Sequence, residues 1–163
     1  MKIALLVVAV ILALIALVLI IGARLPRHHV ASRSAVIRAN RHAVHHLIRN
    51  VADAPRWREG VTQVELLDPT RFREHSKFGV VTYEIVEDLP DTKFVTRIAD
   101  RDLGYSGSWT FALGDAEHGA TRLTITEDGE VPNVFFRFMS KFVFGQTSSI
   151  EAYLKSVERH FAR

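Results

Sequence analysis

Apart from Lys2, the first 23 residues are almost entirely apolar, whereas the rest of the chain alternates between apolar and polar positions. From Ile3 to Ala23 no residue is charged and none is proline. A helix rises about 1.5 Å per residue, so this run is long enough for a hydrocarbon core of about 30 Å. The pattern predicts a transmembrane anchor over residues 1–23. A cleaved signal peptide is the alternative, but its apolar region is normally about 7–15 residues long.

The residues after the anchor are strongly basic. Eight arginines fall between Arg24 and Arg58, and five of the eight histidines lie in the same stretch. We interpret residues 24–32 as a basic linker and residues 33–163 as one globular domain. Because positive residues favour the cytoplasmic side, the domain is expected in the cytoplasm, behind a single membrane pass. Beside an anchor, such a stretch favours an anionic membrane surface as the partner and argues against nucleic acid.

The domain begins with a predicted strand over residues 33–38, followed by a helix. Asn40 is a suitable N-cap, and the apolar positions of residues 41–51 recur at helical spacing. His42, His45, His46 and Arg49 fall on the opposite face. Two histidines four residues apart can hold a metal, but no carboxylate joins them, so this face is expected to be solvated and no metal site is predicted.

Strands follow, in which apolar and polar residues alternate. The expected strands cover residues 61–67, 71–78, 81–85, 93–100, 105–113 and 122–126. Phe72 and Phe78 share one face of their strand, while the pattern over 93–100 assigns no inward face. Such alternation indicates an antiparallel sheet with one buried and one wet face. An aromatic-rich segment over 133–144 and a break at Gly145 lead to an amphipathic C-terminal helix over 150–161.

The expected fold is therefore α+β, with a curved antiparallel sheet of about six or seven strands wrapped on a long C-terminal helix. Such an arrangement encloses apolar volume between the sheet and the helix. The expected lining consists of Trp57, Tyr83, Tyr105, Trp109, Phe111 and Phe138. Aromatic stripes more often fill a core than border a cavity, and both readings stay open.

Several segments, in this order and spacing, resemble the START and polyketide cyclase/dehydrase-like superfamily, also called SRPBCC, which has the helix-grip fold. The segments are Ala35-Val36-Ile37-Arg38-Ala39-Asn40, Asp53-Ala54-Pro55-Arg56-Trp57, Gly107-Ser108-Trp109-Thr110-Phe111, Gly119 to Glu127, Gly129-Glu130-Val131-Pro132-Asn133, Phe136-Arg137-Phe138 and Tyr153-Leu154. The resemblance covers roughly Arg33 to the C-terminus. It implies a deep cavity that binds a lipid or another hydrophobic small molecule, and in a minority of members a cyclase or hydrolase activity.

Candidate chemistry is sparse. The chain has no cysteine, which excludes a disulfide framework, a thiolate metal site and a cysteine nucleophile. Nucleophile-elbow, P-loop and dinucleotide motifs are absent from the sequence, and no cofactor is expected. Glu127 continues the inward positions of Leu123 and Ile125, which makes it a ligand-binding candidate, as a hydrogen-bond donor, and a weak candidate for a general acid or base. An ion pair with Arg97 or Arg137 is the alternative role for Glu127.

Three functions remain open. The leading hypothesis is a membrane-anchored module that binds a hydrophobic small molecule or lipid. An enzyme that uses the same cavity, with Glu127 as acid or base, is the second. The third is an interaction protein whose own side chains fill the core. An open cavity would separate the first two hypotheses from the third.

Overall fold

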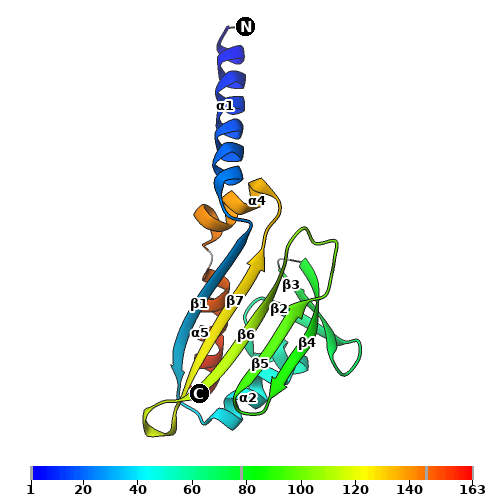
Figure 1. The fold of residues 1–163 in the computed structure, drawn as a ribbon, viewed down its shortest axis with the longest axis vertical. Helices are drawn as coiled ribbons and strands as arrows, with labels where there is room; N and C mark the ends of the chain where they lie inside the picture. The colour runs from blue at the N-terminus through cyan, green and yellow to red at the C-terminus, as the bar shows by residue number, and fades with distance from the viewer. Residues whose placement is uncertain (1, 78, 146, 163) are drawn as a thin grey trace.

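The computed structural model describes residues 2–77, 79–145 and 147–162. Phe78, expected on the inner face of a strand, therefore lies outside the described residues. The element order begins with a long helix and a strand, continues through short helices and six further strands, and ends in helices (Figure 1). The fold is α+β, as the sequence predicts.

Helix α1 (Lys2–Arg24) extends away from the rest of the molecule (Figure 1). Among the described residues it is the one helix long and apolar enough to cross a membrane. Its apolar side chains are exposed, for example Leu6 at 65% and Leu12 at 61%. Only its C-terminal end contacts the domain, where Gly22 is buried. The domain thus folds without help from most of α1.

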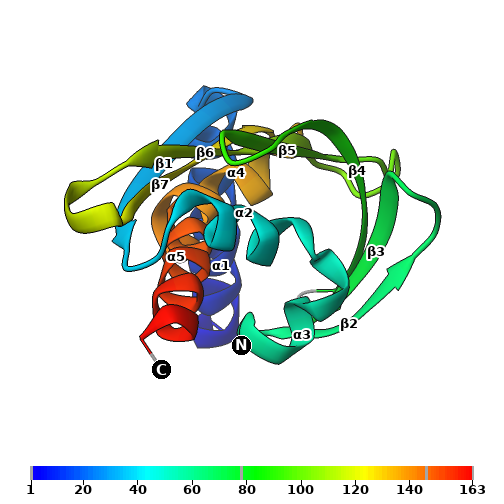
Figure 2. The same cartoon turned by 90° about the horizontal axis from the view of Figure 1, so that it is seen from below.

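Seven antiparallel strands form one sheet in the order β1-β7-β6-β5-β4-β3-β2. The strands are β1 (His28–Ile37), β2 (Val61–Leu66), β3 (Arg71–Ser76), β4 (Gly79–Leu89), β5 (Lys93–Ile98), β6 (Ser106–Asp115) and β7 (Thr121–Glu130). A register shift between Ile85 and Glu87 interrupts the pairing of β4 with β5. Such bulges bend a strand and increase its twist. The sheet curves from β1 round to β2 about the C-terminal helix (Figure 2).

Strand β1 begins earlier than its sequence pattern indicates. It starts at His28 and pairs with β7 from His28 opposite Glu130 to Ile37 opposite Thr121. Residues 28–32, which the sequence assigned to the linker, are therefore part of the sheet. Only three residues, from Leu25 to Arg27, separate α1 from β1. The domain is held closer to α1 than a flexible linker would hold it.

Three short helices connect β1 to β2: α2 (Arg41–Arg49), η1 (Val51–Asp53) and α3 (Ala54–Trp57). Asn40 caps α2 as predicted, because its side chain accepts a hydrogen bond from the Ala43 backbone N–H. The apolar side of α2 buries Val44 and Ile48 in the core. These helices close the open side of the curved sheet (Figure 2).

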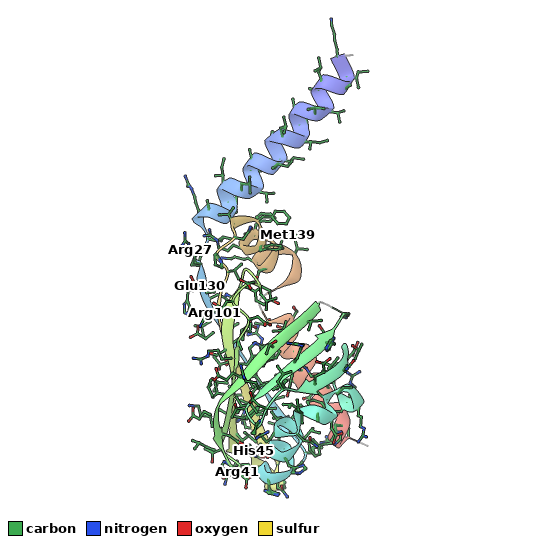
Figure 3. All side chains as sticks on the ribbon, turned by 90° about the vertical axis from the view of Figure 1, so that its right-hand side faces the viewer. Arg27, Arg41, His45, Arg101, Glu130 and Met139 are labelled. Carbon is green, nitrogen blue, oxygen red and sulfur yellow. The ribbon has the colours of Figure 1, made fainter. Side chains whose placement is uncertain are left out.

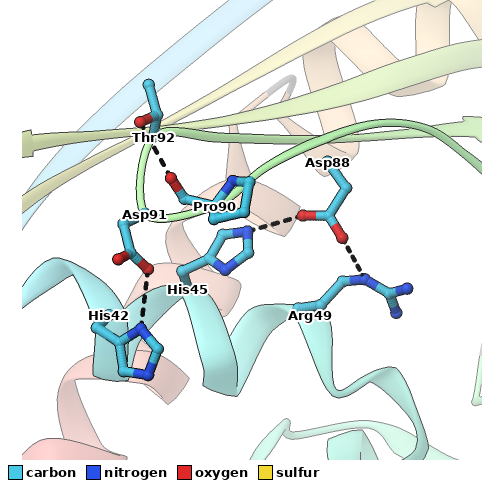
Figure 4. A network of polar contacts seen from close by, with 7 residues as sticks. All are labelled: His42, His45, Arg49, Asp88, Pro90, Asp91 and Thr92. Atoms are coloured by element: carbon cyan, nitrogen blue, oxygen red, sulfur yellow. Dashed lines mark hydrogen bonds and ion pairs between the residues drawn. The ribbon is translucent and has the colours of Figure 1, made fainter.

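The opposite side of α2 is not simply solvated, so this expectation was wrong for His45. The side chain of His45 is buried, and its Nε2 lies 2.9 Å from Asp88 Oδ1 (Figure 4). Arg49 donates to the same carboxylate at 2.6 Å, and His42 contacts Asp91 at 3.2 Å. Asp88 near the end of β4 and Asp91 in the following turn therefore pair with the basic face of α2, where His42 and His46 stay exposed. The sequence could not show this because the partners are about 40 residues apart.

After β7 the chain forms α4 (Val134–Met139), a π-helical turn η3 (Ser140–Phe144) and α5 (Ser148–Phe161). Helix α4 lies against the end of α1, whereas α5 lies against the concave face of the sheet (Figure 1). Gly145 has φ of +74° between the two helical pieces, a conformation that favours glycine at this break. Ile150, Leu154 and Val157 of α5 are buried against Leu123 and Ile125 of β7.

Candidate ligand-binding cavity

The concave face of the sheet does not pack completely against the helices. A cavity of about 550 Å³ lies between the sheet, α3 and α5. Pockets for drug-sized ligands typically measure about 300–1,000 Å³. This volume is therefore sufficient for a small molecule of moderate size. If the protein's own side chains filled the core, as the third hypothesis requires, this cavity would be occupied. The side chains of the described residues do not occupy it.

Aromatic rings form much of the cavity wall, and Tyr153 of α5 lies at their centre. Its ring centroid is 5.1 Å from that of Phe111, 5.9 Å from Trp109 and 5.4 Å from Trp57. Phe111 also contacts Phe94, with 5.8 Å between centroids. Tilted and edge-to-face aromatic pairs of this kind contribute beyond their buried area. These contacts join the rings of the wall to one another, and all of these residues line the cavity.

A second aromatic pair lines the side formed by β3 and β4. Tyr83 stacks on Phe72 with 5.4 Å between ring centroids. Burial raises the pKa of the Tyr83 phenol above its usual range, and the nearby Glu74 carboxylate adds to this effect. Tyr83 also lines the cavity. Tyr105, which also lines the cavity, is 43% exposed and marks an opening.

One ion pair is set into the apolar wall. Arg58 Nη1 donates to Glu74 Oε2 at 2.5 Å, and the Glu74 side chain is 8% exposed. The Arg58 guanidinium also lies over the Tyr153 ring, 4.7 Å from its centroid. A charge-assisted hydrogen bond with a cation–π contact offsets part of the cost of removing both charges from water. The pair leaves this part of the cavity without net charge.

Glu127 lies in the same cavity, on the β7 side. Its Oε1 is 3.7 Å from His29 Nε2. Burial raises the pKa of the Glu127 carboxyl, while His29, Ser149 and Trp109 act in the opposite direction. Neither expected arginine pairs with it, since Arg97 binds Glu84 and Arg137 donates to backbone carbonyls. When protonated, Glu127 is a hydrogen-bond donor at the cavity wall.

The structure brings together most of the residues that the sequence singles out. Trp57, Tyr83, Tyr105, Trp109, Phe111 and Glu127 all line the cavity. Phe138 does not, because α4 places it beside Gly22 of α1 and 5.0 Å from the ring of Phe142. Among residues 2–77, 79–145 and 147–162, no three His, Asp or Glu side chains form a group able to hold a metal.

Sequence reasoning missed several polar residues of the cavity, among them His29, Arg58 and Glu74. Glu74 shares the inward face of β3 with Phe72, so strand alternation contained a signal for it. Arg58 directly follows Trp57, but no pattern pairs it with Glu74. His29 falls in the stretch interpreted as a linker, where no inward face was assigned.

Comparisons with known proteins agree with this architecture. The sequence model of the family described as "Polyketide cyclase / dehydrase and lipid transport" matches residues 28–162. A search among curated proteins finds no match.

Solved structures show the same fold at low sequence identity. A START superfamily protein from Mycobacterium smegmatis has a TM-score of 0.69 at 15% identity, over 82% of this chain and 97% of that one. Zhui aromatase/cyclase from Streptomyces sp. R1128 has a TM-score of 0.68 at 14% identity, over 83% and 94%. Ginseng major latex-like protein 151 from Panax ginseng has a TM-score of 0.65 at 11% identity, over 85% and 100%.

The match begins at His28, where β1 begins, and it includes every strand and helix that surrounds the cavity. The SRPBCC resemblance seen in the sequence is thereby confirmed at the level of fold. The chain belongs to the polyketide cyclase / dehydrase and lipid transport family, and it carries an apolar N-terminal helix in addition to the family's domain.

Proposed function

We propose that this protein is a membrane-anchored binding module that holds a hydrophobic small molecule or lipid between its sheet and α5. The observation that carries the proposal is the cavity of about 550 Å³, whose wall is mostly apolar and includes eight aromatic side chains. At about 25 cal/mol per Å² of apolar surface removed from water, such walls favour an apolar ligand. The membrane is the medium from which such a ligand would come.

The contact between α1 and the domain supports an anchor that is retained after synthesis. Gly22 packs so closely on α4 that an added Cβ would lie 2.0 Å from the Val134 carbonyl oxygen. The Arg137 guanidinium donates to the Leu25 carbonyl at 2.7 Å. Cleavage after residue 23 would remove one side of this packing. The surplus of arginine after α1 further supports a cytoplasmic domain on a single-pass anchor.

The charges of the cavity favour a neutral ligand. Arg58 is already compensated by Glu74, and the raised pKa of Glu127 favours its protonated form. A fatty-acid carboxylate would therefore find no free cation among the described wall residues, apart from His29 when protonated. An alcohol, ester or ketone can accept from Glu127 or contact the Tyr83 hydroxyl without bringing a charge. We expect neutral apolar compounds to bind more tightly than their carboxylate analogues.

A pair of matched substitutions tests the proposal. Thr96 lies on the inner face of β5 and lines the cavity, whereas Thr110 of β6 does not line it. Thr96→Phe places a bulky ring inside the cavity and should weaken binding of a neutral apolar fluorescent probe by the full chain in detergent. Thr110→Phe makes the same chemical change outside the cavity and should leave binding intact. Equal probe affinity in both variants and wild type would contradict a ligand site in this cavity.

An enzyme remains the second candidate, because Glu127 and His29 meet inside the cavity. A buried acid beside an imidazole is able to transfer a proton to or from a bound ligand. Glu127→Gln distinguishes the two functions. A binding module should keep its probe affinity, while an enzyme that uses Glu127 should lose turnover by about 10²–10⁴-fold with binding retained.

A further inference from the structure

Helix α4 and the turn η3 expose an apolar surface where a soluble domain would normally bury one. Phe135, Phe136, Phe142 and Val143 are 45%, 57%, 58% and 58% exposed, and we call these four residues the aromatic ridge. Phe135 and Phe136 belong to α4, and Phe142 and Val143 belong to η3, so the four residues lie on two consecutive helical pieces. Contiguous exposed apolar surface on a protein marks a site of interaction.

The opposite side of the same segment is buried and carries a cation. Arg137 is 8% exposed, and its guanidinium donates to the Leu25 carbonyl at 2.7 Å and the Pro132 carbonyl at 3.2 Å. Leu25 directly follows α1, so Arg137 satisfies a carbonyl at the C-terminal end of that helix. A cation is favourable there because of the helix dipole. The segment thus buries a cation, Arg137, while four of its large apolar side chains are exposed.

This arrangement fixes the position of the aromatic ridge relative to α1. The close approach of Gly22 to the Val134 carbonyl leaves no room for a side chain between the two helices. Figures 1 and 3 show α4 directly at the domain-proximal end of α1, with Arg27 and Met139 at the same level. Arg24, Arg27 and Lys141 are exposed around this junction. If α1 spans a bilayer, this level is that of the lipid headgroups.

We propose that the aromatic ridge inserts into the interface of an anionic lipid bilayer, beside the point where α1 leaves it. This inference rests on the proposed function, in particular on α1 as a membrane span. Aromatic and aliphatic side chains are favourable at the boundary between headgroups and acyl chains, and flanking Lys and Arg side chains are attracted to anionic lipids. Continuity with α1 favours the bilayer over a protein partner, because the ridge and α1 leave the domain on the same side.

The aromatic ridge also places one end of the cavity at the membrane surface. Ser140 and Gly145, which lie two residues before Phe142 and two residues after Val143, both line the cavity. Ser148 and Ser149 at the start of α5 line it as well and are exposed. An apolar ligand would therefore enter from the headgroup region without crossing bulk water. The ridge acts as a second membrane contact that holds this opening against the lipid.

Single-cysteine labelling tests the inference, because the native chain has no cysteine. Phe136→Cys and Phe142→Cys place an environment-sensitive NBD dye on the ridge. Val36→Cys is the matched control, since Val36 is an apolar residue 48% exposed near the far end of β1. The full chain is reconstituted into vesicles of phosphatidylcholine and phosphatidylglycerol. We expect the dye at both ridge positions, and not at Val36, to shift its emission to the blue and to be quenched by brominated lipid.

Two additional measurements distinguish the ways in which the inference can fail. Flotation with vesicles after alkaline extraction tests whether α1 is inserted in the bilayer. A chain that does not float would contradict α1 as a membrane anchor and, with it, the insertion of the aromatic ridge. If the chain floats but the dyes on the aromatic ridge show the same emission and quenching as the dye at Val36, only the contact between the ridge and the bilayer is contradicted. A blue shift without lipid quenching, together with a dimer by crosslinking, would assign the ridge to a second copy of the chain and overturn the bilayer contact.

Discussion

Replacing Trp109 by alanine measures how open the cavity is in solution. Trp109 packs against Phe111 and Tyr153, with 6.1 Å and 5.9 Å between ring centroids, and also borders the cavity. Truncation of a fully packed Phe or Trp costs about 3–5 kcal/mol of unfolding free energy. Because one side of Trp109 has no packed neighbour to lose, we expect Trp109→Ala to cost only about 2 kcal/mol.

Leu123→Ala supplies the comparison for this prediction. Leu123 is completely buried and does not line the cavity, so its truncation should cost about 3–4 kcal/mol, within the usual range for leucine. Both variants are measured in the full chain in detergent, by urea denaturation followed through the circular dichroism of the sheet. A larger loss for Trp109→Ala than for Leu123→Ala would refute the reasoning, because it would show that the space beside Trp109 is filled.

Three further predictions address the charges and the boundaries of the domain. Glu74→Gln leaves the Arg58 guanidinium in the cavity wall without its carboxylate partner. Since the Arg58 side chain is 24% exposed, we expect urea denaturation to show a loss of about 2–3 kcal/mol of unfolding free energy. The variant should also bind a fatty-acid probe more tightly relative to a neutral probe, and unchanged selectivity would contradict this role of Glu74. Burial raises the pKa of Glu127 in the folded protein, so folding favours the protonated carboxyl. This contribution to the unfolding free energy is fully present below the ordinary glutamate pKa, and it is lost as the pH rises through the pKa of the folded protein. Glu127→Gln should therefore raise the melting temperature more at pH 8 than at pH 4, and an equal change at both would count against a raised pKa. A truncated protein of residues 27–163 should unfold cooperatively. One of residues 33–163 lacks the first half of β1 and should unfold at a lower urea concentration. Equal urea midpoints for the two would show that the early start of β1 adds no stability.

The aromatic walls were predictable because strand alternation is a strong local signal. Trp109 and Phe111 face inward on β6 for the same reason that Leu123 and Ile125 do on β7. The period of two residues assigns all of them to one face before any partner is known. Most of the cavity wall and the α+β class follow from this pattern together with the amphipathic C-terminal helix.

Features that depend on distant partners could not be predicted. The first half of β1 has no apolar alternation to reveal a strand, and its pairing with β7 comes from residues about 100 positions away. The burial of His45 requires Asp88, and the Arg58–Glu74 pair joins the turn after α3 to β3. Phe138 was expected in the cavity wall, but α4 places it beside Gly22 of α1. The sequence of α4 alone does not reveal this contact with α1.

If α1 spans a membrane and the cavity binds a ligand, as proposed above, the contact between α1 and α4 also affects how tightly the cavity needs to hold that ligand. A freely diffusing carrier must retain its ligand for the whole crossing between membranes, which requires slow dissociation. A domain whose cavity stays beside the lipid instead meets a high local concentration of any compound that partitions there, as in other tethered systems. Weak and rapidly exchanging complexes then suffice for high occupancy. Affinities measured in dilute solution would consequently underestimate how much of the protein is loaded at the membrane.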